Sequence, residues 1–146
     1  MIAIPSELKL DSFAVLQSHY EFNQPKRNPK DPRRFFNLYE IDVDFAHQIN
    51  DDNTIQVFTK ISVNQGEKIL PGYQLLVEGA ALFSLGNTEE LTEKERNNLK
   101  FYSTVNILVG YLRNTLMMIT SSAPMGPYLL PPVNMTDLFR KKSENK

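Results

Sequence analysis

The chain has 146 residues, 41% of them hydrophobic and 23% charged, and a formal net charge of −1. This length and composition predict a single globular domain over residues 1–142, and the near-zero charge excludes an overall field that would attract nucleic acid or anionic lipid. The sequence has no cysteine, which excludes disulfides, thiolate nucleophiles and cysteine-ligated zinc.

The first two thirds of the chain predict four strands in succession. A first strand is expected over 13–22, where β-forming and polar residues are mixed. Apolar and polar residues alternate strictly over 39–45 and again over 55–63, which is typical of strands with one buried face. A fourth, less regular run covers 73–85, and we expect a bulge or bend at Gly79.

A long connection follows the first predicted strand. Pro25, Pro29 and Pro32 lie within 23–34, and this spacing excludes both a helix and a central strand. The same connection carries the one basic cluster of the chain, which consists of Lys26, Arg27, Lys30, Arg33 and Arg34. Connections of this length are uncommon in small domains and are often functional.

The helical part begins at Thr92, which with Glu95 forms a capping-box pattern. Residues 101–119 then carry apolar side chains on one helical stripe and, on a second face, Ile107, Tyr111 and Met118. A sheet can cover only one of these faces. The second is covered either by segment 92–98 folding back, or by a sister subunit or bound ligand.

The end of the chain predicts an extended apolar connection over 129–134 and a short helix over 135–142, capped by Asn134. Residues 143–146 are expected to be disordered. Because the strands precede the helices, the fold class is α+β with an antiparallel sheet.

Four segments, in order and with similar spacing across about residues 13–139, resemble the SecB protein-export chaperones. They are the first strand (13–17 with Phe22), the end of the fourth strand (77–85), the start of the long helix (106–108 with Tyr111 and Arg113), and the entry to the last helix (132–135 with 137–139).

The resemblance implies a four-stranded antiparallel sheet with a long helix and a short C-terminal helix packed on one side. It also implies a homotetramer, a dimer of dimers joined through the long helices, and clients that lie in apolar grooves beside the crossover loop, the sheet and the terminal helix. We expect the oligomer interface to include Ile107, Tyr111 and Met118. The side chains expected to bind clients are Phe35, Phe36, Met125, Tyr128, Leu130, Met135 and Phe139.

The sequence also departs from the family pattern. Family members deliver clients to the SecA motor through acidic side chains on the sheet, whereas the matching positions here are His19, Asn23 and Leu76. An aromatic-proline pair of the long helix is replaced by Val109 and Gly110. These differences weaken the expectation of SecA docking, since charge complementarity supplies encounter rate and orientation.

Other chemistry has little support in the sequence. His19 and His47 are the only histidines, and a metal site would need carboxylates, whereas Asp42 and Asp44 point away from the strand face that His47 continues. Residues 51–53 have the composition of a turn without the ligand spacing of a calcium loop. There is no glycine-rich phosphate loop, so we expect neither a nucleotide nor any other cofactor. The basic cluster next to Phe35 would also suit single-stranded nucleic acid.

The sequence therefore predicts a non-enzymatic, ATP-independent chaperone that holds unfolded polypeptide. Methionine and aromatic side chains suit this role because they adapt to varied apolar shapes. A dedicated binder of one client, such as an antitoxin, and an enzyme on an α+β scaffold are the alternatives. Without a signal-peptide pattern at the start or a run of about 20 apolar residues, the protein is expected to be cytoplasmic.

Overall fold

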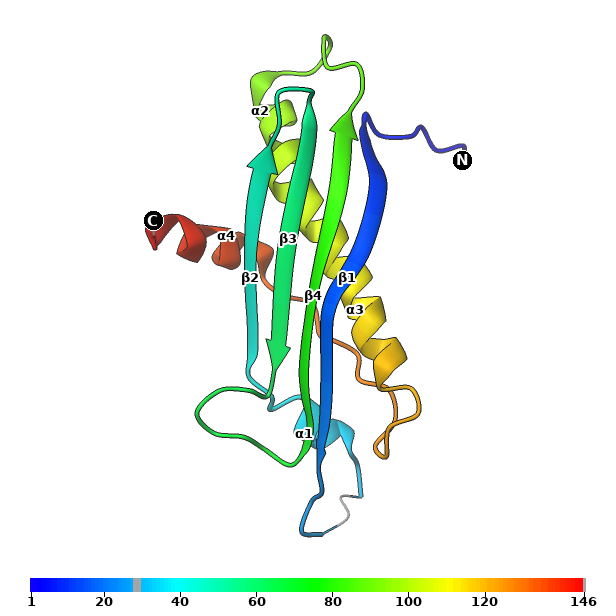
Figure 1. The fold of residues 1–146 in the computed structure, drawn as a ribbon, viewed down its shortest axis with the longest axis vertical. Coiled ribbons are helices and arrows are strands. Elements are labelled where there is room, and N and C mark those ends of the chain that lie inside the picture. Colours follow the sequence, from blue (N-terminus) through cyan, green and yellow to red (C-terminus); the bar gives the residue numbers. More distant parts are fainter. Residues whose placement is uncertain (28–29, 146) are drawn as a thin grey trace.

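Four antiparallel strands form one sheet in a computed structural model that describes residues 1–27 and 30–145 (Figure 1). The strands are β1 (Leu8–Asn23), β2 (Ile41–Ile49), β3 (Thr54–Val63) and β4 (Gly72–Leu85), in the order β1-β4-β3-β2. The predicted α+β class with a four-stranded antiparallel sheet is confirmed. Because β1 and β2 occupy opposite edges, the chain between them must cross one end of the sheet.

This crossover segment, residues 24–40, includes the short helix α1 (Arg33–Phe36). The Asp31 carboxylate accepts a hydrogen bond from the backbone N–H of Arg33 at 3.0 Å, which supports the first turn after Pro32. Pro25 is buried, and Pro29 lies outside the described residues. The predicted long connection is therefore partly helical.

A continuous helix over 93–119 covers one face of the sheet (Figure 1). It consists of α2 (Glu93–Asn97), a π-helical segment η1 (Asn98–Ser103) and α3 (Thr104–Ile119), and the backbone is helical at both junctions. The predicted capping box is confirmed, since Thr92 and Glu95 bond to each other's backbone N–H at 3.2 and 2.8 Å. Segment 92–98 thus extends the helix, and the alternative that it folds back over the second face is wrong.

The core lies between α3 and the sheet, and it contains the alternating positions predicted for the second and third strands. Its fully buried members on β3 and β4 are Ile55, Val57, Ile61, Val63, Tyr73, Leu75, Val77 and Phe83. The irregularity predicted at Gly79 is present, because the register between β1 and β4 shifts between the pairs Val15–Gly79 and Gln17–Glu78. A Cβ at this position would come within 2.8 Å of the Leu112 side chain on α3, so glycine allows the helix to approach β4 closely.

The extra residues of the sheet lie on β1, between Leu10 and Ser12 and, opposite Gly79, between Val15 and Gln17. Each extra residue changes which side chains face the core. Consequently Phe13 packs against Tyr111 of α3, whereas Tyr20, seven positions later, packs against Tyr73. This explains why the sequence of β1 shows no regular alternation.

Helix α4 (Met135–Glu144) lies beyond the β2 edge, where the C-terminus is seen in Figure 1. Its predicted cap is confirmed, because the Asn134 side chain accepts a hydrogen bond from the N–H of Asp137 at 3.0 Å. The helix continues past the predicted end at residue 142, so Ser143 and Glu144 are helical and not disordered as predicted. Lys146 lies outside the described residues.

Candidate functional site

The residues predicted to bind clients are divided among several places. Phe35 lines a cavity between the crossover segment and the start of β4. Phe36 and Met125 line a second cavity, on the other side of α1. Met135 and Phe139 line a third cavity, between α4 and the helix that precedes it. The structure therefore gives separate apolar surfaces and not one continuous groove.

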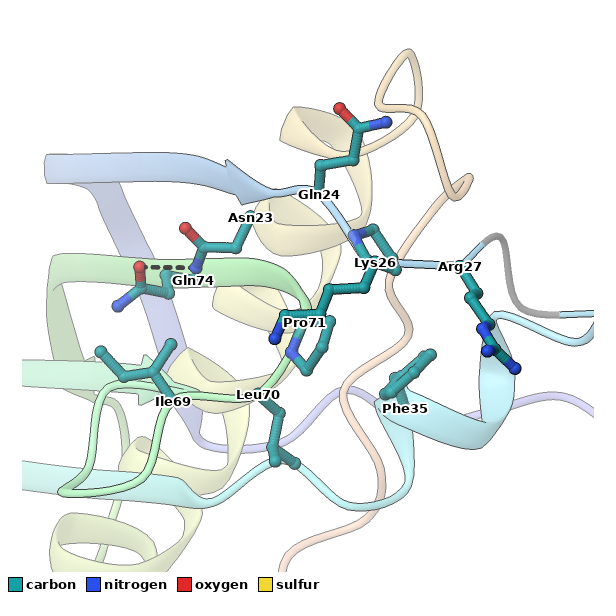
Figure 2. A pocket seen from close by; sticks show the side chains of 10 residues that line it. Asn23, Gln24, Lys26, Arg27, Phe35, Ile69, Leu70, Pro71 and Gln74 are labelled. Carbon is teal, nitrogen blue, oxygen red and sulfur yellow. Dashed lines mark hydrogen bonds between the residues drawn. The ribbon is translucent and has the colours of Figure 1, made fainter.

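The first cavity, named here the crossover pocket, has a volume of about 580 Å³ and is lined by residues 23–27, Phe35, 69–71 and Gln74 (Figure 2). Phe35, Leu70 and Pro71 supply apolar surface, and Lys26 and Arg27 extend from the first strand's end. The Asn23 amide donates a hydrogen bond to the Gln74 side-chain oxygen at 2.8 Å (Figure 2). An open apolar cavity with a few polar groups is the usual form of a binding site.

The wall of the crossover pocket is held in place by Asn64. This residue is buried and adopts a left-handed conformation (φ 57°), which asparagine tolerates better than most residues. Its amide nitrogen donates to the carbonyl oxygens of Leu70 and Tyr73, and its amide oxygen accepts from the N–H of Leu70, all at 2.8 Å. The sequence indicated only a turn at this position, and it did not predict Ile69 and Leu70 as part of a site.

The crossover segment carries five basic side chains. None of the five forms an ion pair or a side-chain hydrogen bond within residues 1–27 and 30–145, and all five are exposed. These residues are Lys26, Arg27, Lys30, Arg33 and Arg34. The neutral chain thus carries a local positive charge around an apolar surface.

The second cavity has a volume of about 400 Å³ and lies between α1 and the connection that follows α3. Phe36 forms its inner side and packs against the rings of Tyr73 and Tyr128, with centroids 5.4 Å away in both cases. The Tyr73 hydroxyl donates to the Gly126 carbonyl and accepts from the N–H of Met125, at 2.8 and 2.7 Å. These bonds tie the connection to the sheet.

Tyr128 and Leu130 were predicted to bind clients, but the structure places them in the core, at 0% and 3% exposure. The connection is extended here, so alternate side chains face opposite sides, and Leu129 is the exposed one, at 63%. The Tyr128 N–H donates to the Thr120 hydroxyl at 2.8 Å, and burial raises the pKa of the Tyr128 phenol. The prediction is therefore wrong for Tyr128 and Leu130 in this protomer.

The α4 site, defined by Phe139 and its neighbours, joins α4 to β2 and η1. The Phe139 ring packs edge-on against Phe45 at 5.0 Å and against Tyr102 at 4.5 Å. The Lys142 ammonium lies over the Phe45 ring and forms an ion pair with Asp44 at 2.6 Å. A hydrogen bond from Lys142 lowers the pKa of Asp44 below its ordinary value. No residue of α4 is fully buried.

Asp44 also protects an open strand edge. In β2 the even-numbered residues pair with β3, as shown by the bonds of Asn64 to Glu40 and of Asn50 to Thr54, so the N–H of Phe45 points away from the sheet. The Asp44 carboxylate accepts a hydrogen bond from this N–H at 2.9 Å. One side chain thus satisfies an edge donor and anchors α4.

The second face of the long helix is exposed in the protomer. Ile107, Tyr111 and Met118 are 36%, 44% and 63% exposed. A Cβ added at Gly110 would meet nothing within 4 Å, so this glycine lies on the open side of the helix in the protomer. The predicted apolar surface is present, and no part of the described protomer covers these three side chains fully.

Nothing in the described part of the chain gathers three or more His, Asp or Glu side chains into a metal-binding arrangement. His47 packs between Phe45 and Phe101 and lies 3.3 Å from the Thr104 hydroxyl, as expected of a residue at the edge of the core. No helix among the described residues is both long and apolar enough to cross a membrane.

Comparisons with known proteins agree with this fold. The family described as preprotein translocase subunit SecB matches residues 12–146, and the chain therefore belongs to the SecB family of chaperones. An uncharacterized protein of Methanocaldococcus jannaschii is 29% identical over 95% of this chain and 86% of its own length.

Among solved structures, the chain is similar to the SecB-like chaperone of Mycobacterium tuberculosis, which was solved in complex with a ChAD peptide from the HigA1 antitoxin. The TM-score is 0.56 with 18% identity, and the match covers 86% of this chain and 90% of that one. A protein of unknown function from Streptococcus agalactiae matches with a TM-score of 0.43 and 14% identity, over 89% of this chain and 100% of that chain.

Proposed function

We propose that this protein is an ATP-independent, non-enzymatic holdase of the cytoplasm, which binds unfolded polypeptide segments on the crossover pocket, the second cavity and the α4 site. Membership of the SecB family supports this function. So does the main structural observation, which is that apolar side chains beside extended connections remain accessible in the protomer, among them Phe35, Met125 and Leu129.

The proposal includes a homotetramer. Tyr111 and Met118 leave an apolar helix face uncovered, and the bare backbone at Gly110 beside it would let a second helix approach closely. Several apolar surfaces on one particle would be engaged together by a long client. Such multivalency raises avidity by about 100-fold or more over a single weak surface.

Hand-over to SecA is not part of the proposal. Neither His19 nor Asn23 has an acidic side chain, so neither supplies a negative charge. Leu76 adds none. A basic docking partner would find little complementary charge at these three positions.

The test is the aggregation of an unrelated, chemically unfolded protein diluted into buffer without nucleotide. We expect the chain to suppress light scattering when present at one tetramer per client, because client apolar segments are then covered. Unchanged aggregation in a large molar excess of this protein would contradict the proposal.

A second candidate is a dedicated binder of one protein. It is favoured by the similar mycobacterial chaperone, which was solved with a peptide from an antitoxin. Capture from the native lysate separates the two candidates, since a holdase returns many proteins and a dedicated binder returns one.

The oligomer is tested with the double variant Tyr111→Asp/Met118→Asp. Two charges on this face should lower the mass measured by light scattering, because each would be desolvated in the interface. The matched control, Gln65→Asp/Asn87→Asp, adds the same charge to exposed loops and should keep the mass of the parent protein. A tetramer that survives the first pair of substitutions would show that another face holds it together.

A further inference from the structure

The crossover pocket combines an apolar surface with cations that form no ion pair within the described residues. Phe35, Leu70 and Ile69 line it, and Ile69 is 51% exposed. A leucine or phenylalanine side chain of a bound segment would be buried against these apolar side chains. Burial of one such side chain contributes about 1.5–3 kcal/mol to binding before the entropy of ordering is subtracted.

Lys26 and Arg27 belong to the lining of the same pocket (Figure 2). Neither has an ionic partner in the described parts of the chain, and the nearby Asp31 carboxylate is bonded to the backbone of Arg33. The cations of α4 differ: Arg140, for example, is paired with Asp137 at 2.7 Å. The charges of Lys26 and Arg27 are therefore available to a ligand of this pocket.

The pocket also offers hydrogen bonds to an extended backbone. The bond from the Asn23 amide nitrogen to the Gln74 oxygen leaves the Asn23 oxygen and the Gln74 amide nitrogen available, one an acceptor and the other a donor. An extended peptide presents both kinds of group along its length. Base recognition would instead need a series of exposed aromatic rings, whereas this pocket has one ring, Phe35, among aliphatic and proline side chains.

We propose that the crossover pocket selects extended polypeptide segments in which acidic residues flank an apolar side chain. This inference rests on the proposed holdase function and names the class of client that this surface prefers. The apolar residue lies against Phe35 and Leu70, and the carboxylates pair with Lys26 and Arg27. The preference comes from local charge, since the chain as a whole carries −1.

The test compares three fluorescent peptides with one Leu/Phe core, flanked by Asp and Glu, by Asn and Gln, or by Lys. At low ionic strength the acidic peptide should bind about tenfold more tightly than the amide peptide, as expected for a few partly exposed charge pairs. The Lys-flanked peptide should bind most weakly. Salt above the physiological range should remove most of the difference, because it screens such charges.

The variant Lys26→Gln/Arg27→Gln should bind the acidic and amide peptides equally. Its matched control, Lys9→Gln/Lys94→Gln, removes two exposed cations elsewhere and should keep the preference. An acidic peptide that binds no more tightly than the amide peptide would overturn the inference, as would equal losses in the two variants.

Failure of this inference can be distinguished from failure of the holdase function. If all three peptides bind equally and aggregation is still suppressed, only the acidic preference is wrong. If no peptide binds and aggregation proceeds, the holdase function fails as well. A single-stranded oligonucleotide is the competing ligand. If it displaces the acidic peptide and binds more weakly to Lys26→Gln/Arg27→Gln, the ligand of this pocket is nucleic acid and the inference is wrong.

Discussion

The crossover pocket and the α4 site are both apolar surfaces beside the sheet, but they are built in opposite ways. The pocket wall is fixed by the buried Asn64 and its three hydrogen bonds. The cations beside the pocket form no ion pair with any residue that the structure describes. Helix α4 has no buried residue, and its Lys142 is neutralised by Asp44. One region is rigid and charged, whereas the other is loosely held and locally neutral.

This difference suggests a division of labour in binding varied segments. A rigid, charged pocket can discriminate between clients, because its groups are already in position. A helix held by a few surface contacts can move to fit different apolar side chains, because little free energy is lost when it shifts. The following variants test whether the two regions differ in this way, in order of decreasing expected effect.

The largest expected effect comes from comparing Phe36→Ala with Phe139→Ala. Phe36 packs against three tyrosines that belong to the core, so its loss should lower the free energy of unfolding by about 3 kcal/mol. Phe139 contacts Phe45 and Tyr102 at the periphery, and its loss should lower the same quantity by about 1 kcal/mol. Urea denaturation measures both. A larger loss for Phe139→Ala would reverse the comparison.

A smaller effect is expected for Tyr73→Phe, which removes the two hydrogen bonds to the connection near Gly126. The free energy of unfolding should fall by about 1–2 kcal/mol. Burial also raises the pKa of Tyr73 to about 12, from about 10 in an unfolded chain. Its contribution is thus complete below pH 10 and is lost as the pH rises from about 10 to about 12.

Urea denaturation at several pH values measures both parts of the Tyr73 prediction. The variant should show a shallower fall in stability above pH 10 than the parent protein. Equal slopes would indicate that the Tyr73 hydroxyl is no less solvated in the folded state than in the unfolded state.

The smallest effect is expected for Lys142→Gln, which removes the ion pair with Asp44. Asp44 is largely exposed and Lys142 partly so, and stability should therefore change by no more than about 1 kcal/mol. Amide hydrogen exchange in α4 should nevertheless become faster. Lys141→Gln is the control, because Lys141 pairs with Asp137 within α4 and makes no ion pair with β2.

The same ion pair predicts a pH dependence. The lowered pKa of Asp44 means that its contribution is present above the ordinary carboxyl pKa of about 4 and is lost as the pH falls below it. Exchange in α4 of the parent protein should therefore approach that of Lys142→Gln at low pH. Identical α4 exchange in the two proteins at neutral pH would show that the ion pair does not hold the helix.

Much of the fold could be predicted from the sequence, because its strongest patterns are local. The alternation from Tyr39 to Phe45 and the capping box at Thr92 each depend on neighbouring residues, and both predictions are confirmed. The pattern of β1 could not be interpreted in full, since two irregularities reverse its faces. The irregularity at Gly79 was predicted, but the close approach of the Leu112 side chain to this glycine was not, because Leu112 is distant in sequence.

The site was harder to predict for the same reason. An apolar residue on an extended connection can face the core or the solvent. Only the three-dimensional path of the chain shows that Leu129 is exposed and that its neighbours Tyr128 and Leu130 are buried. The wall at Leu70 depends on hydrogen bonds from Asn64, whose sequence indicated no more than a turn. The sequence did indicate which connections carry the candidate surfaces.

The central claim is that these two regions are the surfaces on which non-native chains bind. Hydrogen exchange of the protein, with and without a saturating unfolded client, tests it most directly. We expect slower exchange in the crossover segment and in α4, and little change in β3, whose core positions are already protected. The account would be contradicted if the protein prevents aggregation of the client while hydrogen exchange in both regions stays unchanged.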